Sequence, residues 1–324
     1  MLRKAVLTVV CLLFIMGVAL AVTGGPLSLA AEKVRFGTPH KLEPHHNLAL
    51  LAADEKGFFK EEGVELDWIP FKGGRRMQRA VIAGRVDMAS TLTIFFINGV
   101  SKGLPGLLVA DLQMFNPFFI SVPTNSPIKE ARELTGVKIG ISRIGSLSHL
   151  YVQAIAKKLG LEGQFKFIGV GGYLSMVAAL KTGSIGAMAT DFFVTMPLKL
   201  RGEVRSVVEL TDYLPDDWAG LALYAHRDFA KNNGQAVRNF VKSYFRGTEF
   251  IMKNRRWTID KMKSFVGYSE AVAQATYPVL RWGKGDKINI KGIKNVIRFM
   301  LDSGFITKDK VPSMDKLVTT KFIQ

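Results

Sequence analysis

An internal repeat restricts most strongly how this chain can fold. Residues 60–91 (KEEGVELDWIPFKGGRRMQRAVIAGRVDMAST) are matched by residues 158–190 (KLGLEGQFKFIGVGGYLSMVAALKTGSIGAMAT). Gly63, Gly73, Gly84 and Thr91 of the first copy align with Gly160, Gly171, Gly183 and Thr190 of the second, at separations of 97 to 99 residues. Each copy reads as a helix end, a β-rich strand, a glycine loop, a second helix and a short apolar strand.

The repeat predicts two α/β lobes. A further strand precedes each copy, VRFGT from Val34 and VKIGI from Val137. A strand, a helix and a second strand form a βαβ unit, and such units usually build an open parallel sheet. Two copies are too few for a solenoid, in which stacked repeats share one core. We therefore expect two lobes, each with its own mainly parallel sheet flanked by helices.

Two connections are expected to join the lobes as a two-segment hinge. A long extended stretch with prolines at positions 105, 117, 123 and 127 separates the copies, and a second crossing is suggested by SVVELTDYLPDDWAGLALYAH. This places lobe one at residues 31–122 and 220–324, and lobe two at residues 123–219. Ligands of open α/β sheets bind beyond the carboxyl ends of the strands, so a small molecule is expected between the lobes.

The N-terminus has the three-part layout of a secretory signal peptide, predicted at residues 1–30. Arg3 and Lys4 precede an apolar run from Ala5 to Val22, and small residues follow. Cleavage after Ala30 or after Ala21 fits the pattern, and an uncleaved membrane anchor is the alternative reading. We expect an exported protein in the periplasm or another extracytoplasmic compartment.

Composition excludes several classes of function. The single cysteine, Cys11, lies inside the apolar run, so an exported product would contain no disulfide, thiolate metal site or cysteine nucleophile. The net charge of +17 is concentrated after residue 226, where 20 Lys and Arg face 8 Asp and Glu. These charges alternate with apolar residues at helical spacing, which is typical of solvated helix faces, and no nucleic-acid partner is expected. No nucleophile–base pair, nucleotide-binding glycine fingerprint or metal signature is present.

The motifs ADEKGFFKEEGVELDWIPFKGG and AVIAGRVDMAST resemble those of solute-binding proteins of ABC-type importers for nitrate, sulfonates, taurine and thiamine precursors, the SsuA/THI5-like family. The segments AALKTGSIGAMATD and GIKNVIRFMLDSGFITKDKVPSMDKLV extend the similarity, although Gly186 stands where the family usually has an acidic residue. The resemblance implies a two-lobed periplasmic-binding-protein-like fold of type II.

The function implied is capture of a small polar or anionic solute in the cleft between the lobes and its delivery to the permease of an ABC importer. The protein is expected to be monomeric, without cofactor, metal or enzymatic activity. A ligand-sensing module for a membrane receptor uses the same binding physics and stays open. The fold-related pyrimidine synthase of thiamine biosynthesis is a further alternative, for which the resemblance implies an intracellular address and a cysteine-rich motif.

Loops at the strand ends supply the candidate ligand-binding residues of lobe one. His40 and His46 belong to a histidine cluster with His45, and Ser90 and Thr91 end the last strand of the first copy. The histidines are expected to offer neutral hydrogen bonds to a ligand, with surface or capping roles as the alternative. A metal site would need three or four converging groups, and no such pattern is evident.

Lobe two contributes a helix start and several side chains around it. Free backbone N–H groups at Gly145, with the hydroxyls of Ser146 and Ser148 and the ring of His149, could bind an anion, and simple serine capping is the alternative. Asp191 either caps the next helix or binds a ligand amine. The apolar wall of the ligand site, or else part of the core, is expected from Tyr173, Phe192 and Trp218.

Overall fold

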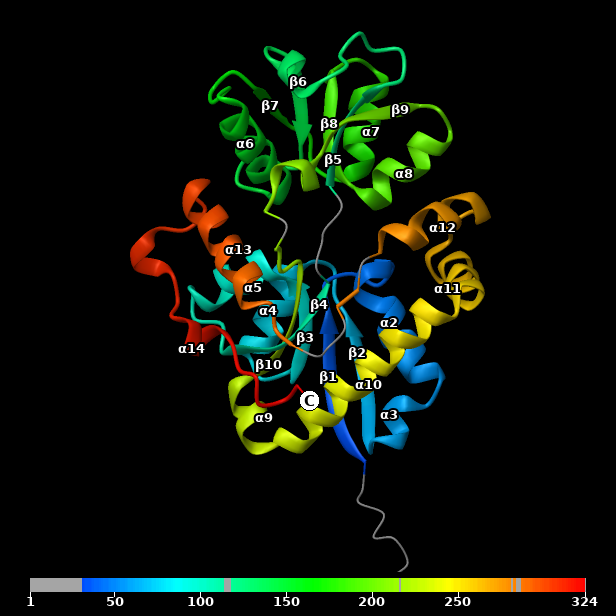
Figure 1. Ribbon diagram of the computed structural model, residues 1–324, viewed down its shortest axis with the longest axis vertical. Coiled ribbons are helices and arrows are strands. Elements are labelled where there is room, and N and C mark those ends of the chain that lie inside the picture. The colour runs from blue at the N-terminus through cyan, green and yellow to red at the C-terminus, as the bar shows by residue number, and fades with distance from the viewer. Residues whose placement is uncertain (1–30, 114–117, 216, 281, 284–286, 324) are drawn as a thin grey trace, which may run out of the picture. The chain divides into compact units, whose positions relative to one another are not determined.

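The protein contains two five-stranded sheets (Figure 1). The structure is a computed structural model, and it describes residues 31–113, 118–215, 217–280, 282–283 and 287–323. The first sheet has the order β2-β1-β3-β10-β4 and the second β7-β6-β8-β5-β9. The strands of the first sheet are β1 (Glu32–Thr38), β2 (Val64–Pro70), β3 (Met88–Leu92), β4 (Gly106–Gln113) and β10 (Leu221–His226). Those of the second are β5 (Phe118–Pro123), β6 (Lys138–Ile141), β7 (Lys166–Gly169), β8 (Ala187–Asp191) and β9 (Val204–Glu209).

Each sheet is parallel except for one strand. In the first sheet β10 runs antiparallel to β3 and β4, and in the second β5 runs antiparallel to β8 and β9. Both exceptions are the first strand that the chain enters after leaving the other sheet. The predicted mainly parallel sheets are confirmed. The strand β5 pairs with β8 and β9 of the second sheet, and the lobe boundaries given from the sequence stay a prediction. The first crossing (114–117) and the expected signal peptide (1–30) lie outside the described residues.

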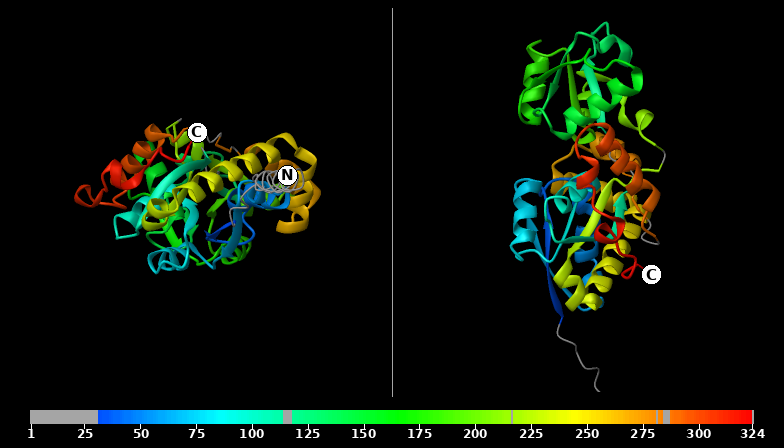
Figure 2. Two further views of the ribbon diagram at one scale, coloured as in Figure 1. Left: turned by 90° about the horizontal axis from the view of Figure 1, so that it is seen from below. Right: turned by 90° about the vertical axis from the view of Figure 1, so that its left-hand side faces the viewer.

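Helices cover both faces of each sheet (Figure 2). In lobe one these are α2 (Pro44–Glu55), α3 (Phe58–Glu61), α4 (Gly74–Ile82), α5 (Thr93–Val100), α9 (Arg227–Asn232) and α10 (Gly234–Lys253). In lobe two they are α6 (Leu147–Leu159), α7 (Tyr173–Lys181) and α8 (Phe192–Leu200). The C-terminal region adds α11 (Arg255–Lys261), α12 (Glu270–Thr276), α13 (Ile290–Asp302) and α14 (Met314–Leu317). Shorter helical turns lie at Ala131–Leu134, Leu210–Tyr213, Met262–Val266, Tyr277–Val279 and Lys308–Lys310.

The aligned glycines adopt the same backbone conformation in both lobes. Gly63 and Gly160 have φ angles of 68° and 70°, and Gly84 and Gly183 have 65° and 70°. A Cβ at any of these four positions would meet no atom within 4 Å, so space does not require glycine there. The left-handed conformation does, because other residues adopt it only with strain. The repeat in the sequence is therefore a repeat of turns.

Packing between α2 and α10 fixes the element that carries the histidine cluster. A Cβ on Gly247 of α10 would lie 2.2 Å from the carbonyl oxygen of Ala49, so the two helix backbones are in direct contact. Phe240 and Tyr244 of α10 are fully buried in the same core as Leu48. The Tyr244 hydroxyl also donates to the carbonyl oxygen of His46 at 3.3 Å. Contacts with α10 therefore fix the position of the first turn of α2.

Candidate functional site

Helices begin directly after the carboxyl ends of parallel strands in both lobes. In lobe one, β1 leads into α2; in lobe two, β6, β7 and β8 lead into α6, α7 and α8. These helix starts carry backbone N–H groups without helical partners and are the usual place for ligands in open α/β sheets. The polar side chains that the sequence singled out lie mostly here.

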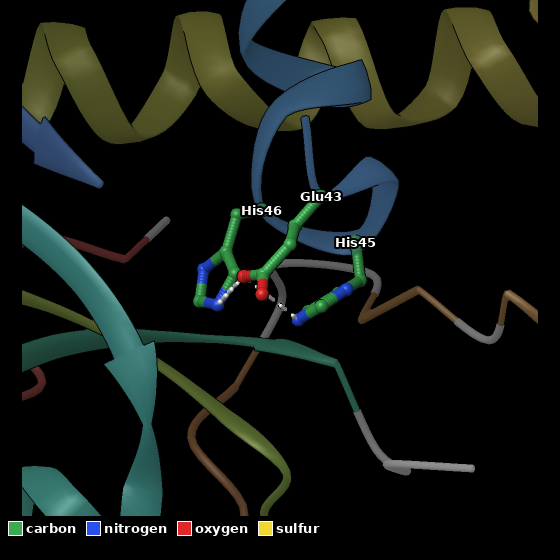
Figure 3. A group of neighbouring side chains, drawn as sticks. All are labelled: Glu43, His45 and His46. Carbon is green, nitrogen blue, oxygen red and sulfur yellow. Dashed lines mark ion pairs between the residues drawn. The ribbon is translucent and has the colours of Figure 1, made fainter. Parts of the chain in front are cut away.

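Glu43, His45 and His46 form a compact group at the start of α2 (Figure 3). The Oε2 atom of Glu43 lies 3.8 Å from Nε2 of His45 and 3.5 Å from Nε2 of His46. Oε1 of the same carboxylate is 3.9 Å from Nε2 of His40, whose side chain is exposed. One potential ligand atom from each of Glu43, His45 and His46 lies within 4.8 Å of the other two. One carboxylate and two imidazoles are residue types that bind metal ions, and the sequence did not predict this grouping.

Burial controls the charge of this group. Desolvation lowers the pKa of His45 to about 3, with the neighbouring His40 adding to the effect. Desolvation, followed by His45 and His40, also brings the pKa of His46 well below its ordinary value. The pKa of the Glu43 carboxyl is raised to about 8, first by desolvation and then by the charge of Asp191. The imidazoles are therefore neutral hydrogen-bonding groups at physiological pH.

A hydrogen bond joins His46 to the end of β3. Nδ1 of His46 lies 3.0 Å from the hydroxyl oxygen of Ser90, and both side chains are buried. The structure thus brings together two residues that the sequence proposed separately. Thr91, also buried, is the next residue of the same strand.

Side chains from lobe two approach the group. The ring of Phe193, at the start of α8, stacks on His45 with centroids 4.8 Å apart and an interplanar angle of 10°. Asp191, which ends β8, lies close enough to Glu43 for the two charges to interact. Desolvation raises the pKa of Asp191, whereas hydrogen bonds from Tyr173 and from backbone N–H groups of α8 oppose the increase. Residues from both sheets therefore contribute to one polar site.

Asp191 also caps its helix. Its carboxylate accepts from the backbone N–H of Val194 at 3.2 Å, which confirms one of the two roles considered for it. Tyr173, at the start of α7, is 40% exposed and shares the hydrogen bond with Asp191.

The start of α6 is a closed network of hydroxyls. The Ser146 oxygen accepts from the backbone N–H of His149 at 3.4 Å and lies 2.9 Å from the Ser148 hydroxyl. Ser148 in turn accepts from the backbone N–H of Ser142 at 3.0 Å. Nδ1 of His149 accepts from the backbone N–H of Gly145 at 3.2 Å. Serine capping is confirmed, and the anion role stays a prediction.

The two large apolar candidates lie in the cores. Phe192 is fully buried, with its ring 6.2 Å from that of Phe119. Trp218 is 3% exposed and packs edge-to-face on Phe299 of α13, with centroids 5.6 Å apart. In this conformation neither ring offers an accessible apolar wall to a ligand.

Sequence reasoning did not single out Glu43, Phe193 or Tyr268. Burial is the main cause of the raised pKa of Tyr268, and the nearby carboxyl groups of Asp191 and Glu43 raise it further. Glu43 precedes Pro44, and proline favours the first turn of a helix, so the sequence EPHH after a strand does mark a helix start. No comparable local signal identifies Phe193 or Tyr268, because their relation to α2 depends on contacts between segments more than 140 residues apart in sequence.

Among the described residues, none of the helices combines the length and apolar character needed to cross a membrane. The two sheets of matching strand order, with polar side chains from both meeting at helix starts, define a two-lobed α/β fold of the periplasmic-binding-protein class. Residues 44–256 match the family model described as NMT1/THI5 like, and the chain belongs to that family.

Individual relatives agree with this membership. A putative thiamine biosynthesis protein of Haemophilus influenzae is 24% identical over 309 residues, which cover 91% of this chain and 93% of the relative. A 4-amino-5-hydroxymethyl-2-methylpyrimidine phosphate synthase of Saccharomyces cerevisiae is 22% identical over 248 residues, 69% of this chain and 68% of the enzyme. The periplasmic aliphatic sulphonate binding protein SsuA of Escherichia coli shares the fold, with a TM-score of 0.73, 20% identity, and coverage of 90% of this chain and 92% of that one.

Proposed function

We propose that this protein is an extracytoplasmic solute-binding protein that captures a small polar solute between its lobes and delivers it to the permease of an ABC importer. One observation carries the proposal: side chains that follow the carboxyl ends of strands in both sheets converge, with Phe193 of lobe two stacked on His45 of lobe one. A solute that contacts both groups would favour the conformation in which the lobes approach each other.

The proposed ligand contacts fall into two chemical sets. Asp191, Tyr173, His40 and His46, with Ser90 and Thr91, offer oxygen and imidazole acceptors suited to N–H or O–H groups of a solute. Gly145, Ser146, Ser148 and His149 start a helix, where the dipole favours an anionic or other acceptor group. Phe192 and Trp218 would contact a solute only after a rearrangement of their cores. A small solute with donors at one end and an acceptor or anionic group at the other suits both sets.

The proposed function also requires that the protein is exported and that it meets a membrane permease. The basic, apolar and small-residue layout of residues 1–30 supports a cleaved signal peptide, and SsuA, which shares the fold, is described as periplasmic. We propose a monomer that encounters a membrane permease and carries out no reaction of its own. Permease and ATPase genes beside the coding gene would favour transport over a receptor-sensing role.

A ligand screen tests the binding role. Melting temperatures would be measured with sulfonates, aromatic carboxylates, nitrate and pyrimidines, since a ligand that binds only the folded state raises the melting temperature by mass action. A confirmed ligand should then reduce the radius of gyration in solution scattering. The Asp191→Asn variant should lose affinity for a solute with a donor group at this site. An unchanged radius of gyration with saturating ligand would contradict capture by lobe closure.

A further inference from the structure

We propose that Glu43, His45 and His46 bind a divalent transition-metal ion of the zinc class at the start of α2. The site would have one carboxylate and two imidazole ligands, with at least one coordination position left for water or a solute atom. Imidazole suits zinc and its transition-metal neighbours, whereas magnesium and calcium prefer oxygen ligands. The inference goes beyond solute binding and can succeed or fail independently of it.

One distance within the group matches the edge of a tetrahedral coordination sphere, and a second is slightly longer. Two ligands placed tetrahedrally at 2.0 to 2.2 Å from zinc are separated by roughly 3.3–3.6 Å. The Glu43 Oε2 atom lies 3.5 Å from Nε2 of His46 and 3.8 Å from Nε2 of His45. Ligand atoms of all three residues lie within 4.8 Å of one another, so side-chain rotations that shorten these separations would bring them onto one ion.

The same distances are too long for direct hydrogen bonds. An N–H donor normally lies 2.7 to 3.2 Å from its oxygen acceptor, roughly 0.3 Å or more below the shorter separation here. Glu43, His45 and His46 are thus gathered around one another without bonding to one another. An ion between the three ligand atoms accounts for the convergence better than a carboxylate–imidazole pair does.

Surrounding contacts orient both rings. The Ser90 hydroxyl, 3.0 Å from Nδ1 of His46, can accept the ring N–H and leave Nε2 unprotonated toward Glu43. Such a hydrogen bond on the second ring nitrogen is the usual companion of a metal-bound histidine. The stacked ring of Phe193 limits rotation of His45.

Calorimetry tests the site directly. The full chain, expressed with its own N-terminus and without a polyhistidine tag, would be stripped with EDTA, dialysed and titrated with zinc chloride. We expect one zinc ion per chain, with Glu43→Gln and His46→Gln each weakening binding at least tenfold. Ser90→Ala should weaken it by about tenfold, because it removes only the support of His46. His226→Gln, on β10 outside the group, is the matched control and should leave zinc affinity unchanged.

Cobalt spectroscopy distinguishes loss of the site from loss of the fold. Co²⁺ bound by two imidazoles and a carboxylate should give d–d absorption bands in the wild type and the His226→Gln control, and weaker bands in Glu43→Gln, whose circular dichroism should match the wild type. Absence of stoichiometric zinc binding by the wild type, or equal affinity in Glu43→Gln, would overturn the metal site. Solute binding measured in EDTA reports separately on the proposed function.

Discussion

The two lobes share a backbone plan but not the chemistry of their helix starts. β1, β2 and β3 have the same relative order and direction as β6, β7 and β8, and paired glycines make the same turns. Yet α2 begins with a carboxylate and two buried imidazoles, whereas α6 begins with a network of serine hydroxyls. Backbone conformation and side-chain chemistry therefore vary independently between the lobes. The glycines make the same turns in both, whereas the side chains at the helix starts give each lobe a different set of polar groups.

A second difference lies at the other end of the same strands. Asp87, just before β3, accepts from the backbone N–H and from Nε of Arg35, each at 2.9 Å. The equivalent residue before β8 is Gly186, and its backbone N–H donates to the carbonyl oxygen of Lys138 just as that of Asp87 does to Arg35. The backbone bond is common to both lobes, but the ion pair exists only in the first.

The largest predicted effect concerns the contact between α10 and α2. Gly247→Ala should lower the free energy of unfolding by about 2 kcal/mol, because the clash with the Ala49 carbonyl outweighs the better helix propensity of alanine. Gly234→Ala, in the same helix, is the control: its Cβ would make an ordinary contact with Phe322 at 3.4 Å. Urea unfolding measures both variants. Equal stabilities would mean that the helices separate easily and that α2 is not fixed as described.

Disrupting the ion pair between Asp87 and Arg35 in lobe one should lower the free energy of unfolding by a smaller amount. Asp87→Asn keeps the shape but removes the charge and one acceptor facing Arg35, and should cost about 1.5 kcal/mol. In lobe two, Gly186→Asp should bring no comparable gain, because Lys138 is exposed and a Cβ at residue 186 would lie 2.8 Å from Val137. Urea unfolding of both variants decides the matter. A stabilising Gly186→Asp would show that lobe two can accept the pair after all.

The sequence predicted the backbone plan better than the site. Positive-φ glycines leave a direct trace in the sequence, since few other residues tolerate that conformation, and the spacing of Gly63 and Gly160 therefore located both turns. The sequence placed His46 and Ser90 in strand-end loops of the same lobe but did not predict the hydrogen bond between them. The stacking of Phe193 on His45 and the contact of Gly247 with Ala49 depend on packing between distant segments. Periodicity carries no information on such contacts.

The third prediction compares the two helix starts directly. Ser146→Ala should destabilise the protein by about 1 kcal/mol, because it removes the cap of α6. Glu43 occupies the cap position of α2 but makes no side-chain cap bond there, so Glu43→Gln in EDTA should change stability by less than about 0.5 kcal/mol. Thermal unfolding in metal-free buffer measures both variants. A larger loss for Glu43→Gln than for Ser146→Ala would assign Glu43 a structural role instead of a ligand role.

The smallest effect is the pH dependence contributed by His149. Burial lowers the pKa of this histidine, and its Nδ1 accepts a backbone hydrogen bond from Gly145, which requires the neutral ring. The unfolded chain, with an imidazole pKa of about 6.5, then binds more protons than the folded chain as the pH falls. The contribution of His149 to stability is therefore fully present above the unfolded pKa and decreases as the pH falls toward the lower folded pKa. His149→Asn should lose less stability than the wild type between about pH 8 and about pH 5. Because all other titratable groups are present in both proteins, the difference between the two pH dependences reports the contribution of His149, and identical pH dependences would exclude His149 from the acid response.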